Sequence, residues 1–370
     1  MKFRFLLSFI LLSACCSGMS AKAPGYQKPA WQSTEKNYAI NPVRDLVLIY
    51  QGGDHRPDWT KDQFVPYVTH TFADGRKEWL FDGFLFLEFK DNGKQLIPDL
   101  RMPNACKDDW KRYLDRVFEK GKSLDALNTC IAEQKTVLGD PGFKHKVVLT
   151  ILPPLPHQKD WGELNGKALD FDNVEDAKAA CSWFLDQLVD RFNKGGYDNL
   201  ELSGIYWVAE DMAHNEGFTR NVSDMVHEKG LQFAWIPYYK ASGYDRWQEL
   251  GFDIAYHQPN FFFNKNIPDS RLDESCSLAR QYGMGLELEF DPRALYESKD
   301  SYYDRLDAYM DAYWRNNVFT DAALAYYEGG IGFLEFAKKP SPENRRIIDR
   351  LATIIVERRQ NNSLVPSDTK

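Results

Sequence analysis

The sequence predicts an α/β protein that folds as a single-domain (β/α)8 barrel, also called a TIM barrel, behind an N-terminal leader. Eight short apolar runs recur along the chain, and helical patterns of ten or more residues separate most of them, an alternation typical of a parallel sheet. The barrel is expected to span residues 39–358, and about 320 residues lies within the usual size range of this architecture. No glycine-rich phosphate loop follows any run, which disfavours the rival doubly wound open sheet.

The eight apolar runs are the predicted strands. They are rich in branched and aromatic residues, and several stop at a proline or glycine, such as Pro153, Pro237 and Gly329. In chain order the predicted strands are residues 46–50, 83–89, 147–152, 205–211, 231–236, 252–257, 285–290 and 323–328.

Amphipathic patterns between these runs predict helices. Asn173 is suited to cap one of them, and Gly195 to end it. The predicted helices are residues 109–134, taken as one long helix, then 174–194, 216–229, 273–282, 301–315 and 341–358. The polar residues 359–370 are expected to form a loose tail.

The first residues have the pattern of a secretory signal. Lys2 and Arg4 precede an apolar stretch at 5–12, which is too short to span a membrane. A small residue followed directly by Cys15 resembles the lipobox of bacterial lipoproteins. That resemblance implies a lipoprotein signal peptide of residues 1–14 and a lipidated Cys15 that anchors the protein to a membrane.

Residues 15–38 would then be a polar tether that holds the barrel away from the lipid surface. The protein is expected in the bacterial cell envelope, lipid-anchored at the outer membrane surface or in the periplasm. The alternative is an ordinary signal peptide cut near Ala21.

Composition limits the classes of partner. The formal net charge is −8 and no basic run is present, so nucleic acid is not an expected partner. The 10 Trp, 19 Tyr and 24 Phe residues favour, weakly, a sugar-binding cleft, because a flat ring matches the apolar face of a sugar. The cysteines beyond the leader, Cys106, Cys130, Cys181 and Cys276, form no Cys-x-x-Cys pair. A zinc ribbon is therefore excluded, and the sequence does not determine whether these thiols form disulfides.

In a barrel of this kind the functional site lies at the carboxyl ends of the strands. The residues expected there are carboxylates, amides and aromatic rings, which suit a neutral polyhydroxylated ligand such as an oligosaccharide or polysaccharide better than a phosphate. The candidate substrate-binding residues are Asp54, Glu88, Trp207, Asp211, Tyr238, Tyr239, His257, Gln258, Asn260, Glu287, Tyr327 and Glu328.

Two further acids are the candidate catalytic pair. In the run 285–290, glutamate alternates with apolar residues, so a strand would place Glu287 and Glu289 on the face opposite its apolar side chains. Glu210 ends another apolar run. Hydrolysis of a glycosidic bond needs one acid to protonate the leaving oxygen and one carboxylate to act as nucleophile or base, and burial near Trp207 would raise the pKa of Glu210.

The chain resembles the large superfamily of barrel glycosidases that carry the acid/base on strand four and the nucleophile on strand seven. The resemblance implies that Glu210 is the acid/base and Glu289 the nucleophile. Those enzymes often have asparagine before the acid/base, and Ala209 stands here instead. The role of Glu210 is therefore open, and Asp211 could replace it.

Three segments also resemble a family of secreted bacterial proteins known as domain of unknown function 4855. They are residues 48–52 with Trp59, residues 81–87 and residues 206–210. The likeness would cover residues 40–358. It implies a glycosidase-related barrel in lipoproteins of carbohydrate-degrading bacteria, without a settled substrate.

The first hypothesis is a membrane-anchored glycoside hydrolase that uses Glu210 and Glu289 without a cofactor or metal. The second is a non-catalytic glycan-binding lipoprotein. The third is a metal-dependent hydrolase or deacetylase using His55, His157 or His257, although no His-x-His or His-Glu-x-x-His spacing is present. The sequence leaves open the sugar, the linkage, exo or endo action, the stereochemical outcome, the oligomeric state and the membrane leaflet.

Overall fold

The computed structural model describes residues 43–52, 56–98, 100–213 and 217–362. The predicted signal peptide, the tether, Cys15, Asp54 and His55 lie outside the described residues, and so does the end of the tail, 363–370. In the described part of the chain, no helix is long and apolar enough to cross a membrane.

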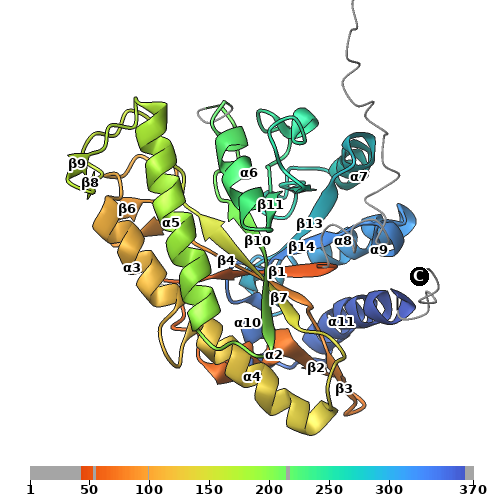
Figure 1. Ribbon diagram of the computed structural model, residues 1–370. Coiled ribbons are helices and arrows are strands. Elements are labelled where there is room, and N and C mark those ends of the chain that lie inside the picture. Colours follow the sequence, from red (N-terminus) through yellow and green to blue (C-terminus); the bar gives the residue numbers. More distant parts are fainter. Residues whose placement is uncertain (1–42, 53–55, 99, 214–216, 363–370) are drawn as a thin grey trace, which may run out of the picture.

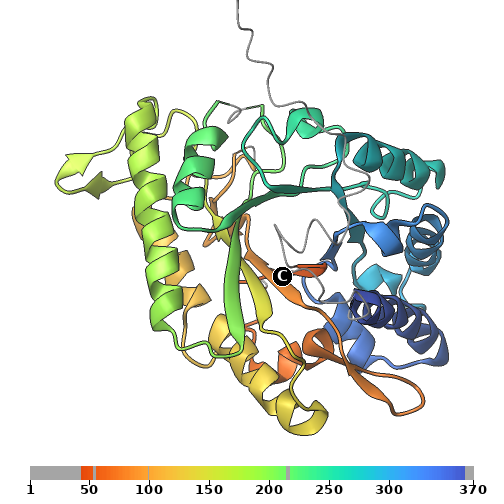
Figure 2. The ribbon, with the colours of Figure 1, turned by 45° about the vertical axis from the view of Figure 1, so that its right-hand side comes forward.

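Eight parallel strands close into a barrel in the order β1-β14-β13-β12-β11-β10-β7-β4, and Figures 1 and 2 show them at the centre of the molecule with the helices around them. Each predicted strand is confirmed, with bounds that differ by a few residues. The barrel strands are β1 (Asp45–Tyr50), β4 (Gly83–Leu87), β7 (His145–Ile151), β10 (Leu200–Trp207), β11 (Gln232–Trp235), β12 (Ile254–His257), β13 (Gly285–Glu289) and β14 (Leu324–Tyr327).

Helices cover the outside of the barrel, and three small hairpins extend from the connecting segments (Figure 1). The helices are α2 (Lys61–Val68), α3 (Lys107–Val117), α4 (Ser123–Leu138), α5 (Val174–Lys194), α6 (Thr219–Glu228), α7 (Ser270–Tyr282), α8 (Tyr303–Arg315), α9 (Val318–Asp321), α10 (Gly332–Lys338) and α11 (Pro342–Asn362), with 3-10 turns η1 (Tyr244–Arg246) and η2 (Pro292–Ala294). The hairpin strands are β2 (Thr69–Thr71) with β3 (Lys77–Trp79), β5 (Lys90–Asp91) with β6 (Lys94–Gln95), and β8 (Glu163–Leu164) with β9 (Lys167–Ala168).

The cap predicted for α5 is confirmed, because the Asn173 side chain accepts a hydrogen bond from the Glu175 amide at 3.0 Å. The single long helix predicted at 109–134 is wrong: the segment forms α3 and α4. Between them Gly121 has φ +78°, and its amide donates to the Asp125 carboxylate at 2.8 Å. α3 ends at Val117 with Phe118 as its C-cap, and the left-handed backbone at Gly121 lies in the turn that separates it from α4. The C-terminal helix α11 continues to Asn362, past the predicted end at residue 358.

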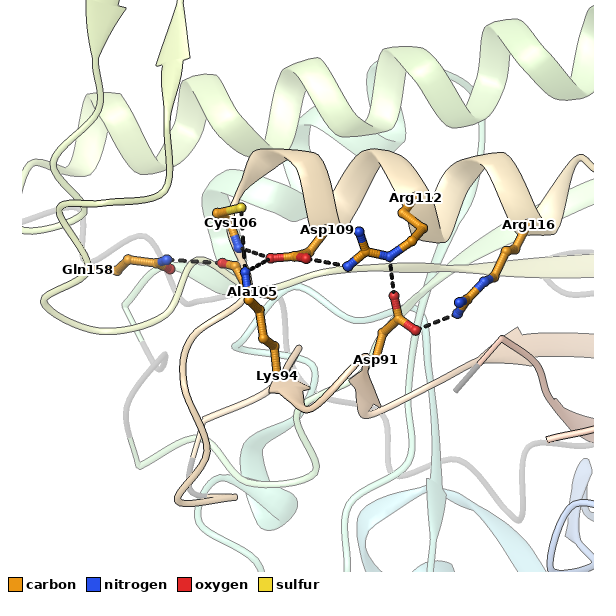
Figure 3. Close-up of polar contacts among 8 residues, drawn as sticks. All are labelled: Asp91, Lys94, Ala105, Cys106, Asp109, Arg112, Arg116 and Gln158. Carbon is orange, nitrogen blue, oxygen red and sulfur yellow. Dashed lines mark hydrogen bonds and ion pairs between the residues drawn. The ribbon is translucent and has the colours of Figure 1, made fainter. Parts of the chain in front are cut away.

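A polar network attaches the hairpin β5–β6 to α3 (Figure 3). Asp91 of the hairpin accepts from Arg112 at 3.0 Å and also binds Arg116. Lys94 of the hairpin donates to Asp109 of α3 at 2.7 Å. This hairpin directly follows Phe89, so the network helps to fix the position of that ring at the carboxyl end of the barrel.

The seam between the first and last strands is held by Arg358 of α11. β1 pairs with β14 on one side and β4 on the other. The buried guanidinium of Arg358 donates to Asp45 at 2.9 Å and to the carbonyls of Phe319 and Ala322 at 2.6 and 2.8 Å, and the Tyr326 hydroxyl donates to Asp45 at 2.7 Å. One side chain thus joins β1, the approach to β14 and the last helix. The four cysteines of the barrel are free thiols.

Replacing Arg358 by methionine should destabilise the fold strongly. The change leaves the Asp45 carboxylate buried without its cation and removes donors from buried carbonyls, a loss of about 3–5 kcal/mol in the free energy of unfolding. Arg346→Met on the same helix removes an exposed ion pair with Asp307 and should cost about 0–1 kcal/mol. Urea titration of both variants measures the difference, and similar losses would contradict the role given to Arg358.

Candidate functional site

A cavity of about 260 Å³ opens at the carboxyl ends of the barrel strands. Residues on or just after β1, β4, β10, β12, β13 and β14 supply its walls. The lining residues are Leu48, Tyr50, Phe89, Tyr206, Glu210, Gln258, Asn260, Phe263, Glu287, Glu289 and Tyr327. Half-buried side chains such as Phe89 and Tyr327 stand at its mouth, and buried ones such as Leu48 and Glu287 close its inner end.

Four aromatic rings form a continuous arc along the cavity, and we call them the aromatic arc. Phe89 packs edge-on against Tyr50 with ring centres 5.6 Å apart, and Tyr50 packs in the same way against Tyr327 at 5.6 Å. Tyr327 in turn contacts Phe263 at 5.5 Å. Because each ring is held at its edge by the next, their faces remain in fixed orientations.

Glu210 follows β10 and has one hydrogen-bond donor in the cavity. Gln258 donates from Nε2 to Glu210 Oε1 at 3.0 Å and to the Ile236 carbonyl at 3.1 Å. Loss of solvent raises the pKa of Glu210 to about 7, against the opposing effect of the Gln258 bond. A carboxyl with this pKa holds a proton for a large part of the time at neutral pH.

Glu289, at the end of β13, accepts more hydrogen bonds from the described residues than the other acids of the cavity. Its Oε2 accepts from the Tyr309 hydroxyl of α8 and from the Phe261 amide at 3.4 Å. Its pKa is raised to about 7, because burial and the charge of Glu210 raise it more than the Tyr309 and Phe261 donors lower it. Since both donors stabilise the ionised form, Glu289 is better suited than Glu210 to carry the negative charge of the pair.

Glu287 lies two residues earlier on β13, on the same face as Glu289. Its Oε1 atom is buried and has no hydrogen-bond partner among the described residues. Burial, and then the charges of Glu289 and Glu210, raise its pKa well above the ordinary value. No lysine, arginine or histidine is among the described residues that line the cavity, so no cation in the lining opposes this rise, which favours the neutral form of Glu287.

The face alternation predicted for 285–290 is confirmed. Phe290 packs outward against Phe333 and Phe336 of α10, with ring centres 5.5 and 6.1 Å away, while Glu287 and Glu289 line the cavity. The structure therefore brings together six of the residues proposed from sequence. They are Glu210, Gln258, Asn260, Glu287, Glu289 and Tyr327.

The same alternation keeps two proposed residues out of the cavity. Trp207 is fully buried against Phe233 and Phe218, because its neighbour Tyr206 occupies the inward position. His257 is fully buried beside Tyr239 and Tyr244, and desolvation lowers its pKa to about 3. Successive side chains of a strand point to opposite faces. A residue next to one that lines the cavity therefore faces the surrounding helices.

The remaining acids proposed from sequence are engaged in structural contacts. Glu88 forms an ion pair with Arg56 at 2.7 Å. Asp211 accepts from the Tyr238 hydroxyl and from the Ser242 amide, both at 2.7 Å. These contacts stabilise the segments around the mouth rather than adding groups to the cavity.

Glu328 and Tyr239 also lie outside the cavity lining. Glu328 is fully buried and accepts from the Tyr67 hydroxyl at 2.9 Å and the Phe333 amide at 3.2 Å. The Tyr239 ring is covered by the Arg271 guanidinium, 3.6 Å from its centre.

Among the described residues, no group of three or more His, Cys, Asp or Glu side chains is arranged to hold a metal ion. His157, a candidate ligand of the third hypothesis, is exposed and bonds Asp172 at 2.7 Å. His257 faces the helical layer, away from the acids of the cavity.

Several lining residues were not proposed from sequence. Tyr50 is the last residue of β1 and Tyr206 the last but one of β10, both at inward positions, so the alternation that identified Glu287 could have found them. Phe89 and Phe263 lie in the segments that follow β4 and β12, where the direction of the chain is not encoded in a local pattern. Tyr309 reaches Glu289 from a helix 20 residues later, a contact that no spacing predicts.

The family described as "Domain of unknown function (DUF4855)" matches residues 45–353 of this chain. No curated protein sequence matches this chain. Among solved structures, it is similar to a mutant tryptophan synthase α-subunit from Pyrococcus furiosus, with 11% identity and a TM-score of 0.35 over 86% of this chain and 98% of that one. It is also similar to the carboxyl transferase domain of Rhizobium etli pyruvate carboxylase, with 11% identity and a TM-score of 0.39 over 92% of this chain and 52% of that one. Similarities this distant do not extend to activity or substrate.

Replacing Glu328 by glutamine should change how stability depends on pH. Burial raises the pKa of Glu328 from 4.5 to about 8, so between these values the folded state holds a proton that the unfolded state lacks. The free energy of unfolding contributed by this group therefore falls as pH rises from 4.5 to 8. Glutamine imitates the protonated acid, so the Tm of the variant should equal that of the wild type near pH 5. Near pH 8 it should be higher than that of the wild type by about 3 °C or more.

Calorimetry at both pH values measures this difference. Glu163→Gln, on the exposed hairpin β8–β9, is the control and should match the wild type throughout. A Glu328→Gln curve parallel to that of the wild type would show that Glu328 is ionised in the folded protein.

Proposed function

We propose that this chain, which belongs to the DUF4855 family, is a glycoside hydrolase that uses Glu210 and Glu289 as its catalytic carboxyl groups. One observation carries the proposal: two glutamates with pKa values raised to about 7 line the same small cavity as an arc of aromatic rings. Glycosidases need a protonated acid and an ionised carboxylate on either side of the scissile bond. Two acids that titrate near neutrality in one site can supply both forms together.

The hydrogen bonds favour one assignment of roles. Glu289 accepts from two donors, Tyr309 and Phe261, which stabilise a carboxylate that attacks the sugar or activates a water. Glu210 accepts from the Gln258 amide alone among the described side chains, and is the better proton donor to the leaving oxygen. The negative charge on Glu289 also stabilises the positive charge that develops on the sugar ring in the transition state.

The aromatic arc suits the apolar faces of a sugar ring. Stacking on Tyr327 or Phe263 would orient a pyranose, while Asn260 and Gln258 bond its hydroxyl groups. The lining has no cationic side chain among the described residues, so a neutral or mildly decorated glycan fits it better than a phosphorylated one. The second hypothesis, a non-catalytic glycan-binding protein, uses the same groups and differs only in the absence of bond cleavage.

Glu289→Gln should abolish hydrolysis and leave the fold intact. The amide cannot act as a nucleophile or base, so kcat should fall by roughly 10³-fold or more. The measurement is sugar release from a panel of aryl glycosides and plant and bacterial polysaccharides, with circular dichroism to monitor folding. Glu328→Gln is a matched control, because Glu328 is also a buried glutamate of raised pKa but lies outside the cavity, and it should retain activity. Full turnover by Glu289→Gln would refute the assignment, and binding without cleavage by the wild type would favour the second hypothesis.

Glu210→Gln should affect substrates according to their leaving groups. Glycosides with poor leaving groups need the proton and should slow by roughly 10²–10⁴-fold, whereas activated aryl glycosides should slow far less. In the wild type, activity falls as pH rises through the pKa of the acid, so this alkaline limb of the kcat/KM profile should disappear in the variant. Equal losses on both substrate classes, with the alkaline limb retained, would rule out proton donation by Glu210.

A further inference from the structure

The inner end of the cavity holds a polar group that the proposed reaction does not use. Glu287 is 2% exposed, and its Oε1 atom has no hydrogen-bond partner among the described residues. A buried polar atom without a partner is costly, and the carboxyl is at the wall of a cavity open to ligand. The Glu287 carboxyl can therefore form a hydrogen bond with a ligand that enters the cavity.

The surroundings of Glu287 define the chemistry of that ligand. Burial raises the pKa values of Tyr50 and Tyr206, and Glu210 and Glu287, when ionised, raise them further, so these two tyrosines and the acids share one environment. A neutral carboxyl group donates one hydrogen bond and accepts another. A hydroxyl group does the same and is its natural partner, whereas an anion would meet the charge of Glu289 without a compensating cation.

The cavity is closed at this end and small. Leu48 and Tyr206, which line the inner end with Glu287, are 2% and 1% exposed, so no passage continues past them. Its volume of about 260 Å³ is below the range of roughly 300–1,000 Å³ that is typical for drug-sized ligands. A sugar unit seated here has no room for a further unit on its innermost side.

We propose that the cavity binds one chain-terminal sugar unit whose innermost hydroxyl group is held by the carboxyl of Glu287. Glu287 is then a specificity-determining residue, and the enzyme releases single sugar units from chain ends. This inference rests on the proposed function for its exo action, but the contact with the hydroxyl group requires only binding.

Two variants of Glu287 test the contact. Glu287→Gln keeps a donor and an acceptor in the same place, and its KM should stay within about threefold of wild type. Glu287→Leu has a similar size without polar atoms, so the ligand hydroxyl loses its partner and kcat/KM should fall by roughly 10-fold or more. Thermal melting monitors folding, and Glu328→Gln again controls for loss of a buried glutamate outside the cavity.

Monodeoxy analogues of the cleaved aryl glycoside identify the hydroxyl group. Removal of one particular hydroxyl group should lower kcat/KM of the wild type by the same factor as the Glu287→Leu substitution does. The same removal should have little further effect on kcat/KM of the Glu287→Leu variant. If every deoxy analogue affects the wild type and the leucine variant equally, Glu287 does not contact a hydroxyl group and the inference is wrong.

The products test the chain-end part of the proposal. Only monosaccharide should appear from an oligosaccharide at early times, and blocking its non-reducing terminal unit with a bulky acetal should stop the reaction. Early release of internal fragments, or cleavage of the blocked chain, would overturn exo action while leaving the glycoside hydrolase assignment standing.

A binding measurement separates failure of the inference from failure of the proposed function. Saturation-transfer NMR with methyl glycosides of the common neutral hexoses and pentoses needs no turnover. Binding by the wild type and Glu287→Gln but not by Glu287→Leu would support the contact even if no glycoside is hydrolysed. Binding by all three proteins, or by none, would overturn it.

Discussion

Closure of the barrel between its first and last strands decides where every residue of the cavity lies. β1 must pair with both β4 and β14, and the buried Arg358 holds that seam through Asp45 and the carbonyls that precede β14. The seam adjoins the cavity, because Tyr50 of β1 and Tyr327 of β14 form the middle of the aromatic arc. Closure also brings residues from β10 and β13, far apart in sequence, to the same mouth, as Figure 2 shows for the strands.

The second constraint on the site is that Glu210, Glu287 and Glu289 share a cavity whose described lining residues include no cationic side chain. Burial raises the pKa of each carboxyl group in the cavity. The charge of Glu210 also raises the pKa values of Glu287 and Glu289, and the charge of Glu289 raises that of Glu287. The cavity therefore favours partly protonated acids at neutral pH, which destabilises the fold relative to an apolar lining and suits acid/base chemistry. Glu328 shows that a raised pKa alone does not identify a site: it is fully buried, but it lies outside the cavity, where Tyr67 and Phe333 donate to its Oε2 atom.

The sequence predicted the eight strands and the helices α5, α6, α7, α8 and α11, because apolar periodicity reflects burial on one face of each element. It also separated the faces of β13, which placed Glu287 and Glu289 together. It failed at 109–134, where one amphipathic pattern is divided into α3 and α4 by a turn that contains the left-handed Gly121, whose amide donates to the Asp125 carboxylate. It also proposed Trp207 and His257 as cavity residues, although their neighbours Tyr206 and Gln258 occupy the lining positions.

The sequence by itself determined the architecture and the strand-end acids, since both follow from patterns within a few consecutive residues. Only the tertiary structure decided which of those acids share a cavity and that Tyr309 and Gln258 donate to two of them. It also decided that Glu287 Oε1 has no hydrogen-bond partner in the described part of the chain. These facts depend on strand register, on the direction of loops beyond the strands and on contacts between elements distant along the chain. Local spacing cannot encode them, because the same alternation is compatible with either face of a strand being turned inward until the barrel closes.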